Sequence, residues 1–142
     1  MGDDEMRTFG TGLFDRWTAL WNGELGLADE IMAPDFVLRY AQAGTDAFDE
    51  IRTPQQLARI VAGWHESHAG LRFAAEGTAV VDLTPADGAP TGLVARPYHA
   101  SFAADGAGKV ARSGVDILRV SDGLIVEVWS VSSGAAGRTF YR

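Results

Sequence analysis

Residues 113–131 restrict the possible folds of this chain more than any other stretch. Two runs rich in β-branched and apolar residues flank Ser121-Asp122-Gly123. An Asp-Gly pair between such runs is typical of a β-hairpin turn, because glycine readily adopts the positive φ that the turn requires. The stretch therefore predicts two antiparallel strands. One acid, Asp116, lies in the middle of the first strand, far from the turn.

The length of the hairpin loop decides which side chains share a face with Asp116. A two-residue loop pairs Asp116 with Trp129, whereas a three-residue loop, a type I turn closed by the glycine, pairs it with Val128. We expect the three-residue loop, because it places Arg119 and Glu127 diagonally on one face of the hairpin. The opposite, largely apolar face then carries Asp116, Leu118, Val126, Val128 and Ser130, while Ile117 and Trp129 point away from it.

Composition and charge limit the classes of function. A chain of 142 residues with 46% hydrophobic and 22% charged residues is expected to form one domain over residues 1–142, with a disordered acidic start at 1–5. The net charge of −7 argues against nucleic acid or an anionic membrane surface as a partner. The chain has no cysteine, which excludes disulfides, thiolate catalysis and zinc–cysteine sites. We find no signal peptide or membrane span and expect a cytoplasmic protein.

Helices are expected first along the chain, and strands afterwards. Apolar and aromatic side chains recur at three- and four-residue spacings over about residues 6–22, which indicates an amphipathic helix. Thr53-Pro54-Gln55-Gln56 combines an N-cap, a proline at the first helical position and a capping-box glutamine, so a second long helix is expected to run to about residue 68. The other expected elements are a helix over 27–33, a strand over 36–40, a loop over 41–49, strands over 71–81, 92–102 and 109–120, and turns at 85–90 and 105–108. This order predicts an α+β domain with helices on one face of a curved sheet.

The hairpin sequence over residues 114–129, together with Ala-Pro-Asp-Phe at 33–36 and the helix–helix–strand–helix order of the first half, resembles the SnoaL-like polyketide cyclases. These belong to the nuclear transport factor 2-like superfamily, with ketosteroid isomerase and limonene epoxide hydrolase. The resemblance implies a cone-shaped α+β barrel, in which a curved antiparallel sheet wraps around the N-terminal helices. It also implies that the open end holds a hydrophobic small molecule and that the chain forms a homodimer.

The resemblance carries over unevenly to individual residues. Asp116 occupies the position of a pocket acid that such cyclases use, and that serves the oxyanion site of ketosteroid isomerase. The first-helix tyrosine of the isomerase falls on Trp17 and its general base on Tyr40, so the resemblance does not extend to steroid isomerisation. Many SnoaL-like chains have an acid directly after the hairpin tryptophan, where this chain has Ser130.

The candidate catalytic residues are Asp116 and, less directly, His99. In an apolar cone, burial is expected to raise the pKa of Asp116 and suit it to acid–base chemistry, although a structural contact to a tyrosine or an amide is the alternative. His99 titrates in the useful range, but strand alternation places it opposite the apolar face of its strand. The expected pocket residues are Trp17, Tyr40, Trp64, Tyr98, Phe102, Leu118, Val128 and Ser130.

No metal or cofactor site is expected. His65 and His68 lie three residues apart near a helix end without a third ligand nearby, and stabilisation of the helix terminus accounts for them better than zinc. The glycine-rich turns match no phosphate-binding fingerprint, because no helix follows them.

Three hypotheses for function remain open. The first is a cofactor-independent enzyme that cyclises or isomerises a hydrophobic small molecule through Asp116. The second is a non-catalytic ligand-binding or accessory protein, which the residues at 17, 40 and 130 favour. The third is a dimeric protein-interaction module. A homodimer is expected through the outer face of the sheet, where Val115, Ile117, Ile125, Trp129 and Val131 form an apolar surface.

Overall fold

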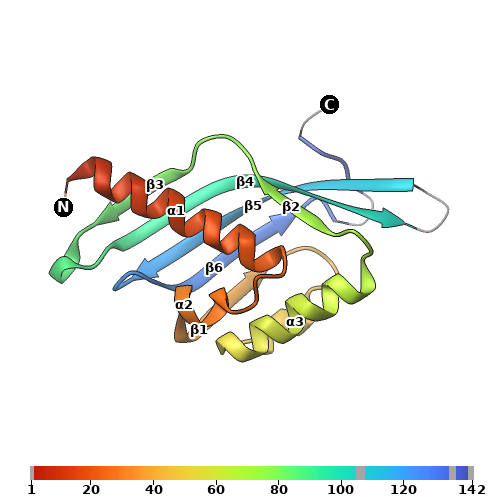
Figure 1. Ribbon diagram of the computed structural model, residues 1–142, viewed down its shortest axis with the longest axis horizontal. Coiled ribbons are helices and arrows are strands. Elements are labelled where there is room, and N and C mark those ends of the chain that lie inside the picture. The colour runs from red at the N-terminus through yellow and green to blue at the C-terminus, as the bar shows by residue number, and fades with distance from the viewer. Residues whose placement is uncertain (1, 105–107, 135–136, 141–142) are drawn as a thin grey trace.

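The computed structural model describes residues 2–104, 108–134 and 137–140, which form one α+β domain. Its helices cover one face of a curved, open sheet of six strands (Figure 1). We call this the inner face and the opposite one the outer face. The elements in chain order are α1 (Asp3–Trp21), α2 (Leu27–Ile31), β1 (Met32–Tyr40), the 3-10 helix η1 (Asp46–Glu50), α3 (Pro54–Ser67), β2 (Arg72–Ala75), β3 (Val80–Thr84), the 3-10 helix η2 (Ala86–Gly88), β4 (Thr91–Ala104), β5 (Gly108–Ser121) and β6 (Leu124–Ser132).

The sheet differs from the expected one in two respects. Its strand order is β1-β6-β5-β4-β2, with β3 also paired to β4. All neighbouring strands are antiparallel except β1 and β6, which are parallel, so the sheet is mixed. The expected single strand over 71–81 is two strands, because the chain turns at Gly77 with a φ of 62°. The sheet is open and curved around the N-terminal helices, as the predicted fold class requires.

The hairpin has neither of the two registers considered from the sequence. Its loop has two residues, Asp122 and Gly123, with φ values of 51° and 78°, so both central residues have the positive φ of a type I′ turn. A register shift near Val126 then adds one residue to β6, and Asp116 pairs with Ser130. Side chains on a strand alternate between its two faces, so the extra residue at this bulge exchanges the faces of the β6 side chains that follow it. The expected grouping on the buried face is therefore right for Asp116, Leu118, Val128 and Ser130, although the expected loop is wrong.

The same bulge corrects the expected outer face. Ile125 precedes the bulge and is fully buried in the core, so it does not belong to the outer surface. Val115, Ile117 and Trp129 are half-buried, and Val131 is 51% exposed. Arg119 pairs directly, not diagonally, with Glu127, and its Nε lies 3.0 Å from the carboxylate.

The helices begin where the local sequence supplies their caps. The predicted capping box at the start of α3 is present: Thr53 Oγ1 accepts from the Gln56 backbone, and the Gln56 side chain accepts from the Thr53 backbone. α1 begins at Asp3, so residues 3–5, which we expected to be disordered, form its first turn. Three acids at a helix N-terminus oppose the positive end of the helix dipole and so favour this earlier start. The turn expected at 105–108 falls mostly on 105–107, outside the described residues.

The core lies between α1 and the inner face, where α1 crosses the sheet (Figure 1). The C-terminal end of α1 is fastened to β2 by the side chain of Asn22, which donates to Phe73 O (2.9 Å) and accepts from Phe73 N (2.7 Å). His65 on α3 donates to Trp21 O at 2.6 Å. These contacts fix the helix end against both α3 and the sheet. No helix in the described part of the chain is long and apolar enough to cross a membrane.

Candidate functional site

A cavity of about 240 Å³ lies between the inner face, the C-terminal half of α1 and α3. The wall is mainly apolar, with aromatic side chains as its largest group, and polar groups occupy a small part of it. Such a composition, mainly apolar with a few convergent polar groups, is typical of small-molecule sites. The lining residues include Trp17, Trp21, Tyr40, Phe48, Trp64, His68, Phe73, Tyr98, Phe102, Arg112, Asp116 and Ser130.

Strand register brings the polar groups together on the inner face. Asp116 on β5 is opposite Ser130 on β6, and Ser130 is opposite Tyr40 on β1. The neighbouring row, Leu38, Val94, Leu118 and Val128, is fully apolar and buried. The polar row therefore lies between an apolar core and the cavity.

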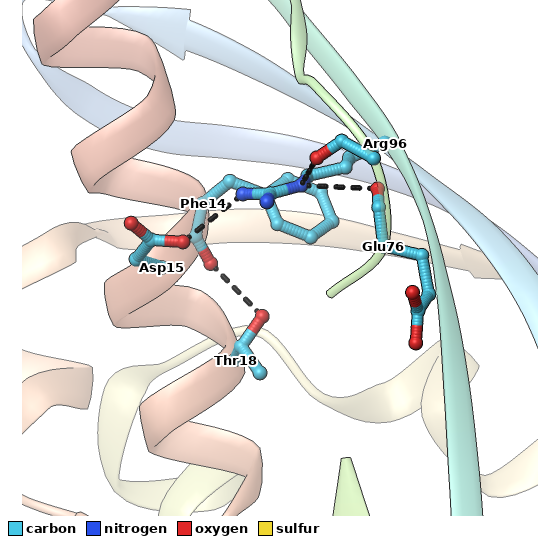
Figure 2. Close-up of polar contacts among 6 residues, drawn as sticks. Phe14, Asp15, Thr18, Glu76 and Arg96 are labelled. Carbon is cyan, nitrogen blue, oxygen red and sulfur yellow. Dashed lines mark hydrogen bonds and ion pairs between the residues drawn. The ribbon is translucent and has the colours of Figure 1, made fainter. Parts of the chain in front are cut away.

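Arg96 is opposite Asp116 on β4 but does not neutralise it. Its guanidinium binds Asp15, with Nη1 and Oδ1 3.0 Å apart, and the backbone carbonyls of Glu76 and Gly77. Figure 2 shows the guanidinium beside Phe14, with dashed lines to Asp15 and Glu76. Among the described residues, no cationic side chain forms an ion pair with Asp116.

Asp116 is a buried carboxyl group with one oxygen held and one oxygen unpaired. Its Oδ2 accepts a hydrogen bond of 2.9 Å from Trp17 Nε1, whereas Oδ1 has no partner within the described protein. Burial raises the pKa of Asp116 from 3.8 to about 6, against the smaller opposite effects of the Ser130 hydroxyl and the Trp17 indole. A carboxyl group with this pKa exchanges protons readily near neutral pH.

Three hydroxyl groups, those of Tyr40, Tyr98 and Ser130, lie near Asp116. The Ser130 hydroxyl is buried and forms no hydrogen bond of ordinary geometry, although it lies directly across from Asp116. Burial and, next, the charge of Asp116 raise the pKa of Tyr40 and of Tyr98 well above 10, so both phenols keep their protons. Gly114 makes room for Tyr98, because a Cβ there would lie 2.5 Å from the tyrosine hydroxyl oxygen. The site thus combines one titratable acid with several neutral hydroxyl donors.

The structure brings most of the predicted site residues to this cavity. Trp17, Tyr40, Trp64, Tyr98, Phe102, Asp116 and Ser130 all line it. Leu118 and Val128 do not, because they belong to the apolar row next to it and are completely buried in the core.

His99 lies away from the cavity, as its strand parity indicated. It pairs with Ser113 on β5 and Ala74 on β2, and its Nδ1 donates to Glu76 Oε1 at 2.6 Å. His99 is therefore not among the residues that line this cavity. Within the described residues, no group of three or more His, Cys, Asp or Glu side chains is arranged to hold a metal ion.

Several residues line the cavity in addition to the predicted pocket residues. Trp21 follows Trp17 by one helical turn, and this spacing alone places both indoles on one face of α1. His68 reaches the cavity from the C-cap of α3, where its Nδ1 lies 3.0 Å from Trp64 O and its ring stacks on Trp64. Arg112 lines the cavity from β5, and its Nε donates to Gly134 O. Phe48 and Phe73 come from short elements whose sequences carry no comparable periodic signal.

Comparison with known proteins identifies similar sequences and structures. A sequence profile described as "SnoaL-like domain" matches residues 12–128. Among solved structures, a provisionally assigned polyketide cyclase from Acidithiobacillus ferrooxidans superposes with a TM-score of 0.67 at 13% identity, covering 87% of each chain. A provisionally assigned SnoaL-like polyketide cyclase from Jannaschia sp. CCS1 gives 0.67 at 17% identity, covering 93% of this chain and 90% of its own.

A third solved structure, IdmH from Streptomyces antibioticus, also provisionally assigned as a polyketide cyclase, gives a TM-score of 0.65 at 20% identity. The match covers 87% of this chain and 91% of IdmH. These identities establish a common fold and nothing finer. No curated protein matches the sequence.

Proposed function

Because the chain belongs to the SnoaL-like family, we propose that it is a cofactor-independent enzyme that acts on a hydrophobic small molecule by acid–base chemistry at Asp116. One observation carries the proposal. Asp116 is 6% exposed, has an unpaired Oδ1 in the cavity region and has no ion-pair partner among the described residues. A buried, unpaired carboxyl group costs stability, and such groups concentrate at functional sites.

The proposed reaction is a proton transfer next to a carbonyl group. Ionised Asp116 removes a proton from the carbon beside a ligand carbonyl, and the electron pair moves to the carbonyl oxygen as an enolate. Tyr40 or Tyr98 donates a hydrogen bond to this oxygen. The carbanion then attacks a second carbonyl of the same molecule, which closes a ring, or it is protonated at another carbon. After ring closure, Asp116 returns its proton to the alkoxide formed at the second carbonyl; in the isomerisation, it returns the proton to the other carbon. No external reactant is required.

The test is the Asp116→Asn variant, which keeps the size of the side chain and an oxygen that can accept from Trp17. We expect turnover of a substrate identified by ligand screening to fall by roughly 10²- to 10⁴-fold, with little change in ligand affinity. Asp122→Asn is the matched control, because it makes the same exchange at the exposed tip of the same hairpin. An Asp116→Asn enzyme that turns over at the wild-type rate would contradict the proposal.

A non-catalytic ligand-binding protein is the second candidate function. It is favoured by the fact that Asp116 is the only carboxylate among the described residues that line the cavity, which leaves no second acid to complete a pair. In this case the Asn variant and the wild type bind the same ligands and neither converts them. Product analysis during prolonged incubation with a bound ligand distinguishes the two candidates.

The proposal includes a homodimer formed through the outer face of the sheet. Val115, Ile117 and Trp129 lie on this face with exposed Val131, and the cross-strand rows extend the surface to Ala95 and Pro97 on β4. A surface of this kind also suits the third candidate, a dimeric protein-interaction module.

A further inference from the structure

The indole N–H of Trp21 is a buried hydrogen-bond donor without an acceptor. Trp21 is 6% exposed, lines the cavity, and its Nε1 has no partner within the described protein. Five aromatic rings surround it, with ring centroids 5.5 to 6.4 Å away: Trp17, Tyr40, Phe48, Trp64 and Phe73. An unpaired donor in such surroundings is unfavourable unless something else accepts from it.

The structure holds the backbone that carries this donor in place. The carbonyl of Trp21 accepts from His65, and the next residue, Asn22, forms two hydrogen bonds with Phe73. The end of α1 is thus attached on two sides, and the indole cannot seek an acceptor by a simple shift of the helix end. Trp17, one turn earlier, has the same side chain but donates to Asp116. The Trp17 indole N–H therefore has an acceptor among the described residues, and the Trp21 indole N–H has none.

We infer that Trp21 is a specificity-determining residue of the cavity, whose indole N–H donates to a carbonyl or ether oxygen of the ligand. This inference rests on the proposed function only in taking the cavity as a small-molecule site. It adds a second anchor, separate from Asp116. An indole is a donor only, so this anchor selects ligands that carry an acceptor and gives no advantage to hydrocarbons.

The test uses two probes that share a skeleton, 1-tetralone and tetralin, which differ only in the ketone. In ¹⁵N–¹H spectra of the full chain, the four tryptophans give separate indole signals, and Trp21→Phe and Trp64→Phe assign two of them. We expect 1-tetralone to move the Trp21 indole proton downfield, as a new hydrogen bond to a carbonyl does. Tetralin should perturb it far less. We also expect the wild type to bind 1-tetralone about five- to tenfold more tightly than tetralin.

Two variants separate the hydrogen bond from the loss of aromatic surface. Trp21→Phe should reduce the preference for 1-tetralone over tetralin to near unity, whatever happens to the overall affinity. Trp64→Phe is the control, because it makes the same exchange in the same cavity wall at an indole whose N–H is not buried without a partner. It should keep the preference. Assigning the Trp21 indole signal in the wild type from its through-space contacts to the Tyr40 and Phe73 rings makes the spectral test independent of the folding of either variant.

Three results would overturn the inference. The first is an indole proton of Trp21 that resonates far upfield without ligand and stays there, because this shows that a neighbouring ring face already accepts from it. The second is equal affinity of the wild type for both probes. In either case, the acid–base proposal for Asp116 stands on its own test. The third is failure of both probes to bind up to their solubility limits, which removes the shared premise of a small-molecule cavity.

Discussion

At the scale of single residues, Asp116 is the most unusual feature of the molecule. Its facing residue on β4 is a cation, yet Arg96 turns toward Asp15 (Figure 2). The carboxyl group is left with neutral neighbours among the described residues, chiefly the Trp17 indole and the Ser130 hydroxyl. The charge of Asp116 is therefore opposed mainly by burial. A replacement that removes the charge should make the protein more stable at neutral pH. Removing a carboxyl group with a structural role would instead destabilise the protein, so the sign of the change separates the two.

The first prediction concerns stability against pH. The pKa of Asp116 is about 6 in the folded protein and 3.8 in the unfolded chain, so the folded state binds more protons between these values. The contribution of Asp116 to stability is therefore fully present below pH 3.8 and is lost as the pH rises through about 6. The loss amounts to roughly 3 kcal/mol. We expect the free energy of unfolding of the wild type, relative to Asp116→Asn, to fall by this amount across the window and then to stay constant.

Urea denaturation of both proteins at a series of pH values measures this difference, and subtraction cancels the other titrating groups. Asp122→Asn provides the baseline, because this acid is exposed at the hairpin turn. If the difference in free energy of unfolding between the wild type and Asp116→Asn did not change with pH, Asp116 would have the same pKa in the folded and the unfolded state, which would contradict the prediction.

At the scale of elements, the position of α1 decides whether the cavity exists. α1 supplies Trp17 and Trp21 to the wall, and Asn22 ties its end to β2 by two hydrogen bonds with the Phe73 backbone. β2 pairs with β4 on one side, and on its other side the Asn22 side chain takes the place of a neighbouring strand for Phe73. β2 has only four residues, so this attachment is a substantial part of what holds it.

The second prediction concerns this attachment. Asn22→Ala leaves the backbone groups of Phe73 without their side-chain partner and should lower the free energy of unfolding by about 1–3 kcal/mol. Asn22→Asp is the matched comparison: it keeps the acceptor for Phe73 N but places an oxygen against Phe73 O, so it should not restore stability. Chemical denaturation gives the energies, and hydrogen exchange at the Phe73 amide reports local opening. An Ala variant as stable as the wild type, with unchanged exchange, would show that the attachment contributes nothing.

At the scale of the whole molecule, the two faces of the sheet have different roles. The inner face is covered by helices and carries the cavity, whereas the outer face exposes apolar side chains around Val131. Arg119 lies over the ring of Trp129 at 5.1 Å and covers only one margin of this surface. The remaining apolar area fits a contact between two copies of the chain.

The third prediction concerns that contact. Val131→Lys places a charge in the proposed interface and should convert a dimer into a monomer, as measured by light scattering at micromolar concentrations. Gln55→Lys adds the same charge on α3, away from the outer face, and should leave the dimer intact. A wild-type protein that is monomeric at these concentrations would remove the basis for the interface.

Local sequence determined much of the fold. The capping box at Thr53 and the aromatic stripe of α1 depend on residues close together in the chain, and both form as predicted. The Asp-Gly turn forms where it was predicted, but with a two-residue loop. The family pattern and strand alternation together indicated Asp116, Ser130, Tyr40 and Tyr98 as pocket residues. Alternation also placed His99 on the opposite face, because a period of two needs no knowledge of the rest of the molecule.

Tertiary structure alone decided the remaining features. The bulge near Val126 depends on how β6 fits between β5 and β1, and it moved Ile125 from the expected outer face into the core. The parallel pairing of β1 with β6 joins segments about ninety residues apart, which no local pattern encodes. Whether a polar atom is satisfied depends on every neighbour around it. Trp17 Nε1 donates to Asp116, whereas Trp21 Nε1 has no acceptor among the described residues, and this difference appears only once the chain is folded.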